Sequence, residues 1–85
     1  MPIFSYQFTS SARKQLKKLP QEIQLRIVKK IKFFCQTNPL IYAERLSSFD
    51  LGDYRFRVGN YRVVFDIKGC MLTVLALGHR REIYR

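Results

Sequence analysis

The hydrophobic pattern at the start of the chain changes from strand spacing to helical spacing. Residues 3–8 alternate aromatic side chains with others, which is the two-residue period of a half-buried strand. Thr9, Ser10 or Ser11 can cap a helix that runs to about Leu19, and Pro20 suits the first turn of a second helix. The positions that helical spacing predicts to be buried are Ala12, Leu16, Leu19, Ile23, Ile27, Ile31 and Phe34.

The second half of the chain reads as three consecutive strands. Residues 54–58, 61–67 and 70–77 are rich in β-branched and aromatic side chains. Turn residues at Gly59-Asn60 and around Lys68-Gly69 separate them, so each neighbouring pair is predicted to form a hairpin. Gly78 is expected to break the last strand. The preceding segment, 40–49, fits either a short helical turn or a covering loop, after a second helix that ends at "TNP" (37–39).

This order of elements predicts the architecture. A strand, two helices and three strands with short connections form an α+β domain, in which both helices cover one face of a mostly antiparallel four-stranded sheet. The 85 residues suffice for one domain, 1–85, with a core of its own.

Alternation within the first hairpin gives its two faces different chemistry. One face carries apolar and aromatic residues and is predicted to pack on the helices: Tyr54, Phe56, Val58, Tyr61, Val63, Phe65 and Ile67. The other face carries Arg55, Arg57 and Arg62, with Arg57 opposite Arg62 in the register that a two-residue turn imposes. Like charges in that position destabilise a sheet.

Two interpretations of the three arginines remain open at this stage. They form either a solvated strand face balanced by acidic residues or a clamp for phosphate groups. A preorganised set of guanidinium groups would stabilise negative charge that develops on phosphorus in a transition state. The acidic residues that could balance them are Asp53, Asp66 and Glu82.

Charge favours a polyanionic partner. The formal net charge is +10, from 16 lysines and arginines against 6 acidic residues. Lysine dominates the positive charge of residues 1–38 and arginine that of residues 39–85. Lysine suits a diffuse attracting surface, whereas arginine grips phosphate oxygens with two hydrogen bonds. The basic side chains predicted on the outer face of the first helix, and assigned to binding the phosphates of such a partner, are Arg13, Lys14, Lys17 and Lys18.

Other compositional signals exclude several classes of protein. Cys35 and Cys70 form no CxxC pair and are interpreted as reduced thiols of a cytoplasmic protein. No clustered metal ligands occur, so neither a metal nor another cofactor is expected. No apolar run reaches the roughly 18 residues of a membrane span, and the first residues lack the features of a signal peptide.

The final segment, "GHRREIYR" (78–85), adds the remaining groups of an RNA-cleaving site. His79, the single histidine, titrates near neutral pH, and Tyr84 could stack on an unpaired base. Taken singly, His79 would be an ordinary surface residue and Tyr84 a packing residue. The further cations of this segment, which could hold RNA phosphates, are Arg80, Arg81 and Arg85.

The ordered set "ARKQLKKLP", "NP" with "AERL", "GDYRFRVGNYRVVFDI" and "LALGHRREIYR" resembles the RelE/ParE superfamily of toxins from toxin–antitoxin modules, and the RelE branch in particular. The resemblance covers essentially the whole chain. It implies a ribosome-dependent mRNA endonuclease that cleaves the codon in the decoding site by attack of a ribose 2′-hydroxyl on the adjacent phosphate. It also implies an acidic, partly disordered antitoxin that wraps the toxin as a hetero-oligomer.

Residue roles are implied where the motifs match. Arg55 and Arg57 take the places of two basic strand residues, and Arg62 that of an arginine associated with transition-state stabilisation. Arg80 matches an arginine linked to leaving-group protonation, and a shift of one residue in the alignment would give this role to Arg81. Tyr84 matches the tyrosine that stacks on a base. Arg57 departs from the pattern, because a guanidinium cannot accept a proton at physiological pH. His79 is therefore the candidate acid or base.

Two other functions stay open beside the nuclease. A ParE-like toxin would inhibit DNA gyrase by binding and would not be an enzyme, although that branch generally lacks the basic strand cluster and the tyrosine near the C-terminus. The third possibility is a basic module that binds an acidic antitoxin without any activity.

Overall fold

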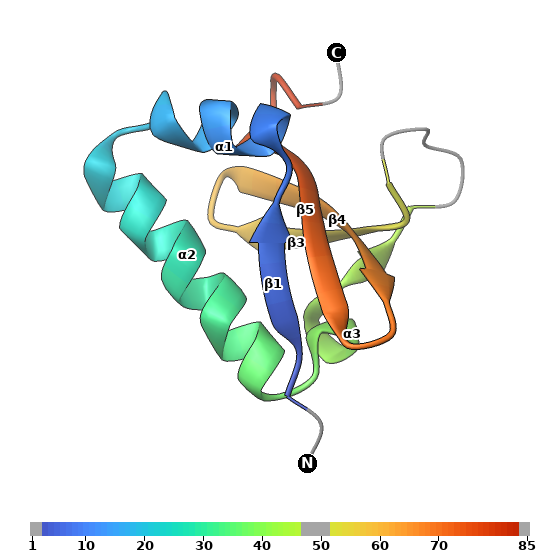
Figure 1. The fold of residues 1–85 in the computed structure, drawn as a ribbon. Coiled ribbons are helices and arrows are strands. Elements are labelled where there is room, and N and C mark those ends of the chain that lie inside the picture. The colour runs from blue at the N-terminus through green and yellow to red at the C-terminus, as the bar shows by residue number, and fades with distance from the viewer. Residues whose placement is uncertain (1–2, 47–51, 84–85) are drawn as a thin grey trace.

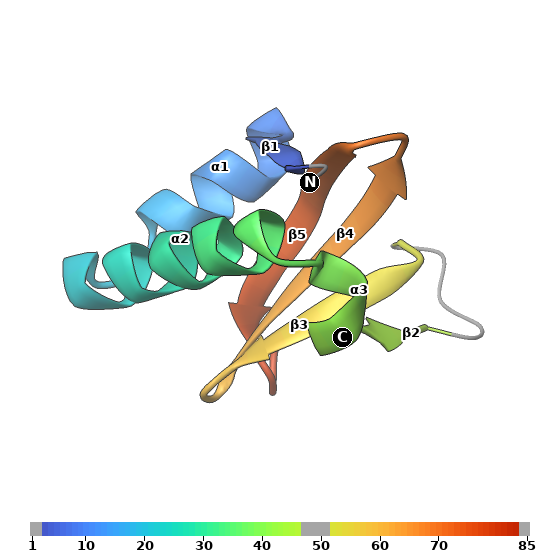
Figure 2. The same ribbon diagram turned by 90° about the horizontal axis from the view of Figure 1, so that it is seen from below.

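A computed structural model describes residues 3–46 and 52–83, in which helices lie against one face of a single sheet (Figures 1 and 2). The helices are α1 (Ser10–Lys17), α2 (Gln21–Gln36) and α3 (Pro39–Tyr42). The strands are β1 (Ser5–Phe8), β2 (Glu44–Arg45), β3 (Tyr54–Val58), β4 (Tyr61–Lys68) and β5 (Met71–His79).

Side-chain caps set the ends of the helices. The Thr9 side chain accepts a hydrogen bond from the Ala12 N–H and begins α1. Pro20 occupies the N-cap position of α2, and at the other end the Thr37 hydroxyl donates to the carbonyl of Phe33. Asn38 caps α3 by accepting from the Leu40 N–H. The side chains of Thr9, Thr37 and Asn38 thus satisfy backbone groups that a helix end leaves without partners, whereas Pro20 makes no such bond.

The sheet is mixed, with strand order β1-β5-β4-β3-β2. β1 pairs with β5 in parallel, and the other three pairs are antiparallel. The β3–β4 hairpin turns at Gly59-Asn60, where Gly59 has a φ of 60°, a left-handed conformation that glycine adopts without steric cost. The predicted α+β class and the layer of two N-terminal helices are confirmed.

The core lies between the helices and the sheet. Phe34 of α2 packs on Phe56 of β3, with ring centroids 4.4 Å apart, and Phe56 stacks on Phe65 of β4 at 4.2 Å. Ala12, Ile27 and Ile31 are also fully buried. The apolar face predicted for the hairpin belongs to this core, either buried or packed against it. The core therefore fixes which face of the hairpin points away from the helices.

Two predictions about the sheet are wrong. The sheet has five strands where four were predicted, because part of the ambiguous segment 40–49 pairs with β3 as the two-residue strand β2; positions 47–49 lie outside the described residues. Gly78 does not end β5, since Arg62 and Tyr61 of β4 pair with Gly78 and His79. A helical turn, one of the two structures considered for segment 40–49, is present at its start as α3.

The cysteines are unbridged. Cys35 is buried in the core and Cys70 is exposed, and burial raises the pKa of the Cys35 thiol. Within the described part of the chain, no helix combines the length and the apolar character needed to cross a membrane.

Candidate functional site

The β3–β4 register places three arginines on the sheet face that points away from the helices. Arg57 lies directly opposite Arg62, and Arg55 is two residues from Arg57 on the same strand. Their sequence neighbours Phe56 and Val63 are buried in the core on the other face. The predicted arginine face and its like-charge pair are confirmed.

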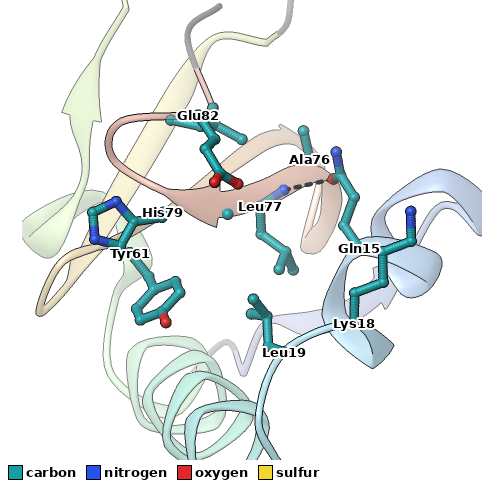
Figure 3. A pocket seen from close by; sticks show the side chains of 10 residues that line it. Gln15, Lys18, Leu19, Tyr61, Ala76, Leu77, His79 and Glu82 are labelled. Atoms are coloured by element: carbon teal, nitrogen blue, oxygen red, sulfur yellow. Dashed lines mark hydrogen bonds between the residues drawn. The ribbon is translucent and has the colours of Figure 1, made fainter.

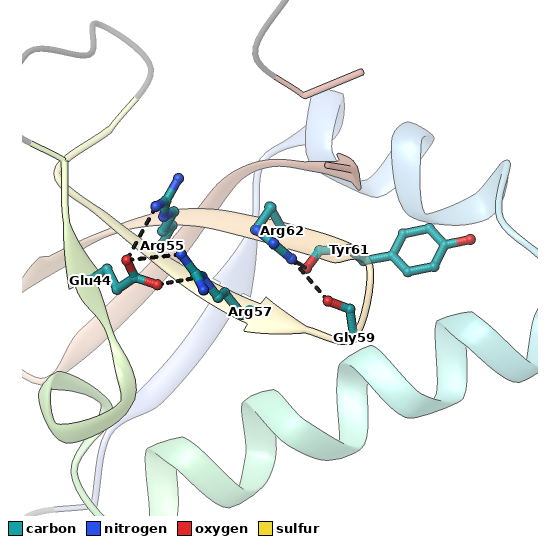
Figure 4. A network of polar contacts seen from close by, with 6 residues as sticks. All are labelled: Glu44, Arg55, Arg57, Gly59, Tyr61 and Arg62. Atoms are coloured by element: carbon teal, nitrogen blue, oxygen red, sulfur yellow. Dashed lines mark hydrogen bonds and ion pairs between the residues drawn. The ribbon is translucent and has the colours of Figure 1, made fainter. Parts of the chain in front are cut away.

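Glu44 of β2 is the carboxylate that meets this face (Figure 4). It pairs with Arg55 in the β2–β3 register, so its side chain lies on the same face as both arginines of β3. One oxygen, Oε2, accepts from Arg55 Nη2 at 3.2 Å and from Arg57 Nη2 at 3.4 Å, and the other, Oε1, lies 2.5 Å from Arg57 Nε. The hydrogen bond from Arg55, and then the charges of the three arginines, hold the pKa of Glu44 below its ordinary value.

Among the residues that the structure describes, the carboxylate paired with Arg55 and Arg57 is Glu44, which was not one of the expected counter-ions. Asp66 was a candidate partner of the arginines, but its Oδ1 accepts the backbone N–H of Asp53 at 2.7 Å. Glu44 was not singled out, because the segment around it was read as a turn or loop. A two-residue strand carries too short a pattern to be recognised, so no signal in the sequence assigns Glu44 to the sheet.

Arg62 is held differently from the other two arginines. Its Nη1 donates to the carbonyl oxygens of Gly59 and Tyr61, each at 3.0 Å, so the guanidinium lies against the hairpin turn (Figure 4). The backbone N–H of Arg80 donates to the carbonyl of Asn60 in the same turn at 2.8 Å. The backbone of the segment after β5 is thereby fixed at the turn that Arg62 also contacts, and the role of the Arg80 side chain stays a prediction.

His79 does not share the arginine face. It pairs with Tyr61 in the β4–β5 register, so its side chain lies on the helix side of the sheet, while Gly78 is the residue that pairs with Arg62. The His79 ring meets the Tyr61 ring edge to face, 5.5 Å between centroids. Its Nδ1 accepts from the Arg81 N–H at 3.2 Å. The expectation that His79 converges with the arginines on one face is wrong, because β5 runs two residues further than predicted and includes His79.

His79 instead lines a pocket of 650 Å³ between α1, the end of β5 and residues 82–83 (Figure 3). Gln15 of α1, Lys18 at the C-cap of α1 and Glu82 of the segment after β5 are among its lining residues. Gln15 Oε1 accepts the Leu77 N–H at 2.9 Å. Polar and apolar groups line this pocket in nearly equal measure.

The other predicted cations are placed apart from the arginine face. Arg13, Lys14 and Lys17 are exposed on α1 and line a shallow groove of 440 Å³, and Lys18 lines the pocket with His79. Tyr84 and Arg85 lie outside the described residues. These assignments stay predictions.

Part of the arginine face is covered. Val64 and Ala76, which pair with each other on that face, are buried. Gly52 lies against Val64 and Leu75: a Cβ there would be 2.8 Å from Val64 Cγ1 and 2.9 Å from Leu75 Cδ1. The accessible part of the face is therefore the end nearest the hairpin turn, where Arg57 is exposed.

Comparison with known proteins gives consistent matches over nearly the whole chain. The family model described as ParE toxin of the type II toxin–antitoxin system, parDE, matches residues 6–84. Toxin RelG of Mycobacterium tuberculosis is 30% identical over 84 residues, 96% of this chain and 97% of that protein.

Two solved structures are similar in both fold and sequence. The toxin–antitoxin complex RelBE2 from Mycobacterium tuberculosis contains a chain with a TM-score of 0.78 and 28% identity, covering 94% of this chain and all of that one. The RelB–RelE complex from Methanococcus jannaschii gives a TM-score of 0.71 and 29% identity, covering 91% of this chain and 93% of that one.

Proposed function

Because the chain belongs to the RelE/ParE superfamily of type II toxin–antitoxin toxins, we propose that it is a ribosome-dependent mRNA endonuclease. It would cleave messenger RNA in the ribosomal A site and so stop translation. The observation that carries this proposal is the arginine face, where Arg55, Arg57 and Arg62 are held together by strand register. A binding protein without phosphate chemistry has no need to place Arg57 directly opposite Arg62, since that pair destabilises the sheet.

The reaction is an internal transfer at phosphorus. The ribose 2′-oxygen attacks the adjacent phosphate and loses its proton, while the bond to the 5′-oxygen breaks and that oxygen gains a proton. The products are a 2′,3′-cyclic phosphate and a free 5′-hydroxyl. Negative charge on the non-bridging oxygens rises in the transition state, and guanidinium groups in fixed positions stabilise it. Arg57 and Arg62 are assigned this role, with Arg55 supporting them.

Proton transfer is assigned to the segment after β5. Arg57 cannot serve as a base, because a guanidinium keeps its proton. Glu44 is a weak base for the same electrostatic reason that lowers its pKa. Arg80 is fixed by its backbone beside the turn that holds Arg62, which supports a role in protonating the leaving oxygen. His79 would act only from the helix side of the sheet, and Tyr84 is proposed to stack on a base.

The proposal is tested with purified protein and ribosomes programmed with a defined messenger RNA. RNA 5′ ends are mapped after brief incubation with the wild type, with Arg62→Ala and with Arg26→Ala. Arg26 is exposed on α2 and gives the same change of charge away from the sheet. We expect Arg62→Ala to slow cleavage about 100-fold, as loss of a transition-state contact does, and Arg26→Ala to cleave normally. Equal rates for all three proteins would contradict the assignment.

A gyrase-binding function is the second candidate, because the matching family model is the ParE toxin. It predicts inhibited supercoiling by gyrase and intact messenger RNA. Running the ribosome assay beside a gyrase supercoiling assay separates the two functions. A protein that binds antitoxin and changes neither readout would be an inactive module.

The proposed partner in either case is an antitoxin. The similar chains from Mycobacterium tuberculosis and Methanococcus jannaschii were solved as toxin–antitoxin complexes. A net charge of +10 favours an acidic segment that folds on contact. The protein is accordingly proposed to act in the cytoplasm, on ribosomes and messenger RNA, and to be stored there as a hetero-oligomer with its antitoxin.

A further inference from the structure

The carboxylate of Glu44 occupies the arginine face in the way that a bound phosphate would. Its Oε2 accepts hydrogen bonds from Arg55 Nη2 and Arg57 Nη2, and its Oε1 forms an ion pair with Arg57 Nε, so the carboxylate contacts Arg57 at both Nε and Nη2. Arginine forms the same forked arrangement with carboxylate and with phosphate. Two ligands of similar shape and charge therefore compete for the same donors.

The geometry lets an incoming anion reach these donors. The side chain of Glu44 is 44% exposed and that of Arg57 is 58% exposed, so the pair lies open to solvent. Glu44 comes from a strand of two residues at the edge of the sheet. Exposed ion pairs are individually weak, which makes this one exchangeable for a better-placed anion.

We infer that Glu44 is an internal competitor for RNA, which holds Arg55 and Arg57 in the free protein and is displaced by the phosphate of a bound substrate. This inference rests on the proposed function. A tethered group acts at an effective concentration of about the millimolar range. A loosely held RNA cannot match that concentration, whereas an RNA strand fixed by other contacts can. Glu44 thus becomes a specificity-determining residue that disfavours free RNA relative to positioned RNA.

The inference is tested by measuring RNA binding without cleavage. A short single-stranded RNA with 2′-O-methyl riboses cannot react, and its binding is followed by fluorescence anisotropy at several salt concentrations. Glu44→Gln keeps the shape of the side chain and removes its charge. Glu22→Gln is the matched control, because Glu22 is exposed in the first turn of α2 and the net charge changes equally. We expect Glu44→Gln to bind about three- to tenfold more tightly than the control, with a steeper salt dependence.

A second pair of variants shows whether the tighter RNA binding of Glu44→Gln depends on Arg57. In an Arg57→Ala background the advantage of Glu44→Gln should shrink, because one competing contact has gone. Equal binding by Glu44→Gln and Glu22→Gln would overturn the inference, and so would a gain that persists unchanged in the Arg57→Ala background. Circular dichroism spectra check that each variant is folded.

These outcomes are distinct from failure of the proposed function. If Arg62→Ala lowers ribosomal cleavage while Glu44→Gln equals its control, the nuclease stands and the internal competitor is rejected. If Arg62→Ala cleaves normally, the proposed function fails whatever Glu44 does in the binding assay.

Discussion

Arg57 and Arg62 face each other across the β3–β4 pair, and the repulsion between their charges destabilises the sheet. Neighbouring groups offset this repulsion in two ways. Arg57 is paired with Glu44, whereas Arg62 turns its guanidinium onto the carbonyl oxygens of the hairpin turn. Both solutions leave the positive groups on the surface and orient them. A chain selected for stability alone would carry threonine or valine at these strand positions. The two arginines therefore indicate selection for a function and not for stability.

The titration of Glu44 gives a prediction for this cluster. Its pKa is lowered in the folded protein, so its ion pairs stabilise the fold above the pKa of an unfolded glutamate and are lost as pH falls through the folded value. The melting temperature of the wild type should therefore exceed that of Glu44→Gln at pH 7, and the difference should disappear as the pH is lowered through the folded pKa of Glu44.

The titration of the Glu44 carboxyl group can be measured directly. In a carbon-detected NMR titration, the Glu44 carboxyl should have a midpoint below that of glutamate in an unfolded peptide. Arg55→Ala should move this midpoint upward, because Arg55 supplies the largest contribution. A midpoint that stays in place in Arg55→Ala would contradict the hydrogen-bonding account.

The sequence predicts single residues well where strict alternation holds. Arg55, Arg57 and Arg62 were assigned to one face because a strand of known register alternates its side chains. His79 was misplaced, since its face depends on whether β5 stops before Gly78 or continues beyond it. Glu44 was missed, because its role is created by a partner strand ten residues further along the chain and not by its local pattern.

Among the elements, α1 supplies a hydrogen-bond acceptor to the part of β5 that extends beyond its pairing with β1. β1 pairs with β5 only as far as Val74, and the chain then turns into α1. The Gln15 side chain accepts the Leu77 N–H, in the position where a neighbouring strand would have supplied a carbonyl. Leu77 is buried, so without this acceptor its N–H would lose a hydrogen bond. One side chain thus holds α1 against the end of β5, beside the pocket that contains His79.

Replacing this side chain tests its role. Gln15→Leu keeps a similar volume but removes the acceptor, and we expect it to lower the free energy of unfolding by about 1 kcal/mol and to speed hydrogen exchange at the Leu77 amide. Gln15→Glu retains a side-chain oxygen and should preserve the protection of that amide. Slow exchange at Leu77 in Gln15→Leu would show that the bond contributes nothing.

How well each helix or strand could be predicted depends on whether the residues that determine it are close together in the sequence. β3 was predicted with the observed bounds, since its pattern and its glycine turn are contiguous in sequence. α2 was predicted from four apolar positions spaced along one face. β2 depends on where α3 delivers the chain relative to β3, and two residues, Glu44 and Arg45, carry no periodic signal of their own.

At the scale of the whole molecule, different kinds of surface lie in different places. Arginines gather on the outer sheet face, whereas lysines are exposed along α1 and α2. Near the C-terminal end of α2 the surface becomes apolar: Phe33, Leu40, Ile41 and Tyr42 are large hydrophobic residues that remain exposed. Phe33 and Tyr42 are in contact, 5.7 Å between ring centroids. Arg26, Lys29 and Lys30 line a groove beside Phe33.

An apolar surface with a basic border suits an acidic segment that also carries apolar side chains. The antitoxin proposed above has this chemistry, and the surface formed by residues 33 and 40–42 offers it a contact that the RNA site does not use. Basic groups would speed the encounter, and burial of Ile41 and its neighbours would hold the complex together.

Replacing one apolar side chain on this surface separates the contribution of apolar burial from that of the basic groups. Ile41 is 71% exposed, so Ile41→Ser should leave the fold intact and weaken antitoxin binding by about tenfold, chiefly through faster dissociation and to the same degree at low and high salt. Leu25→Ser is the matched control, because Leu25 is 66% exposed and lies on α2, whereas Ile41 lies on α3. Lys29→Ala should instead slow association and reduce its salt dependence. If Ile41→Ser and Leu25→Ser bind antitoxin alike in a kinetic binding assay, the antitoxin docks elsewhere, and the exposed apolar residues of α2 and α3 need another explanation.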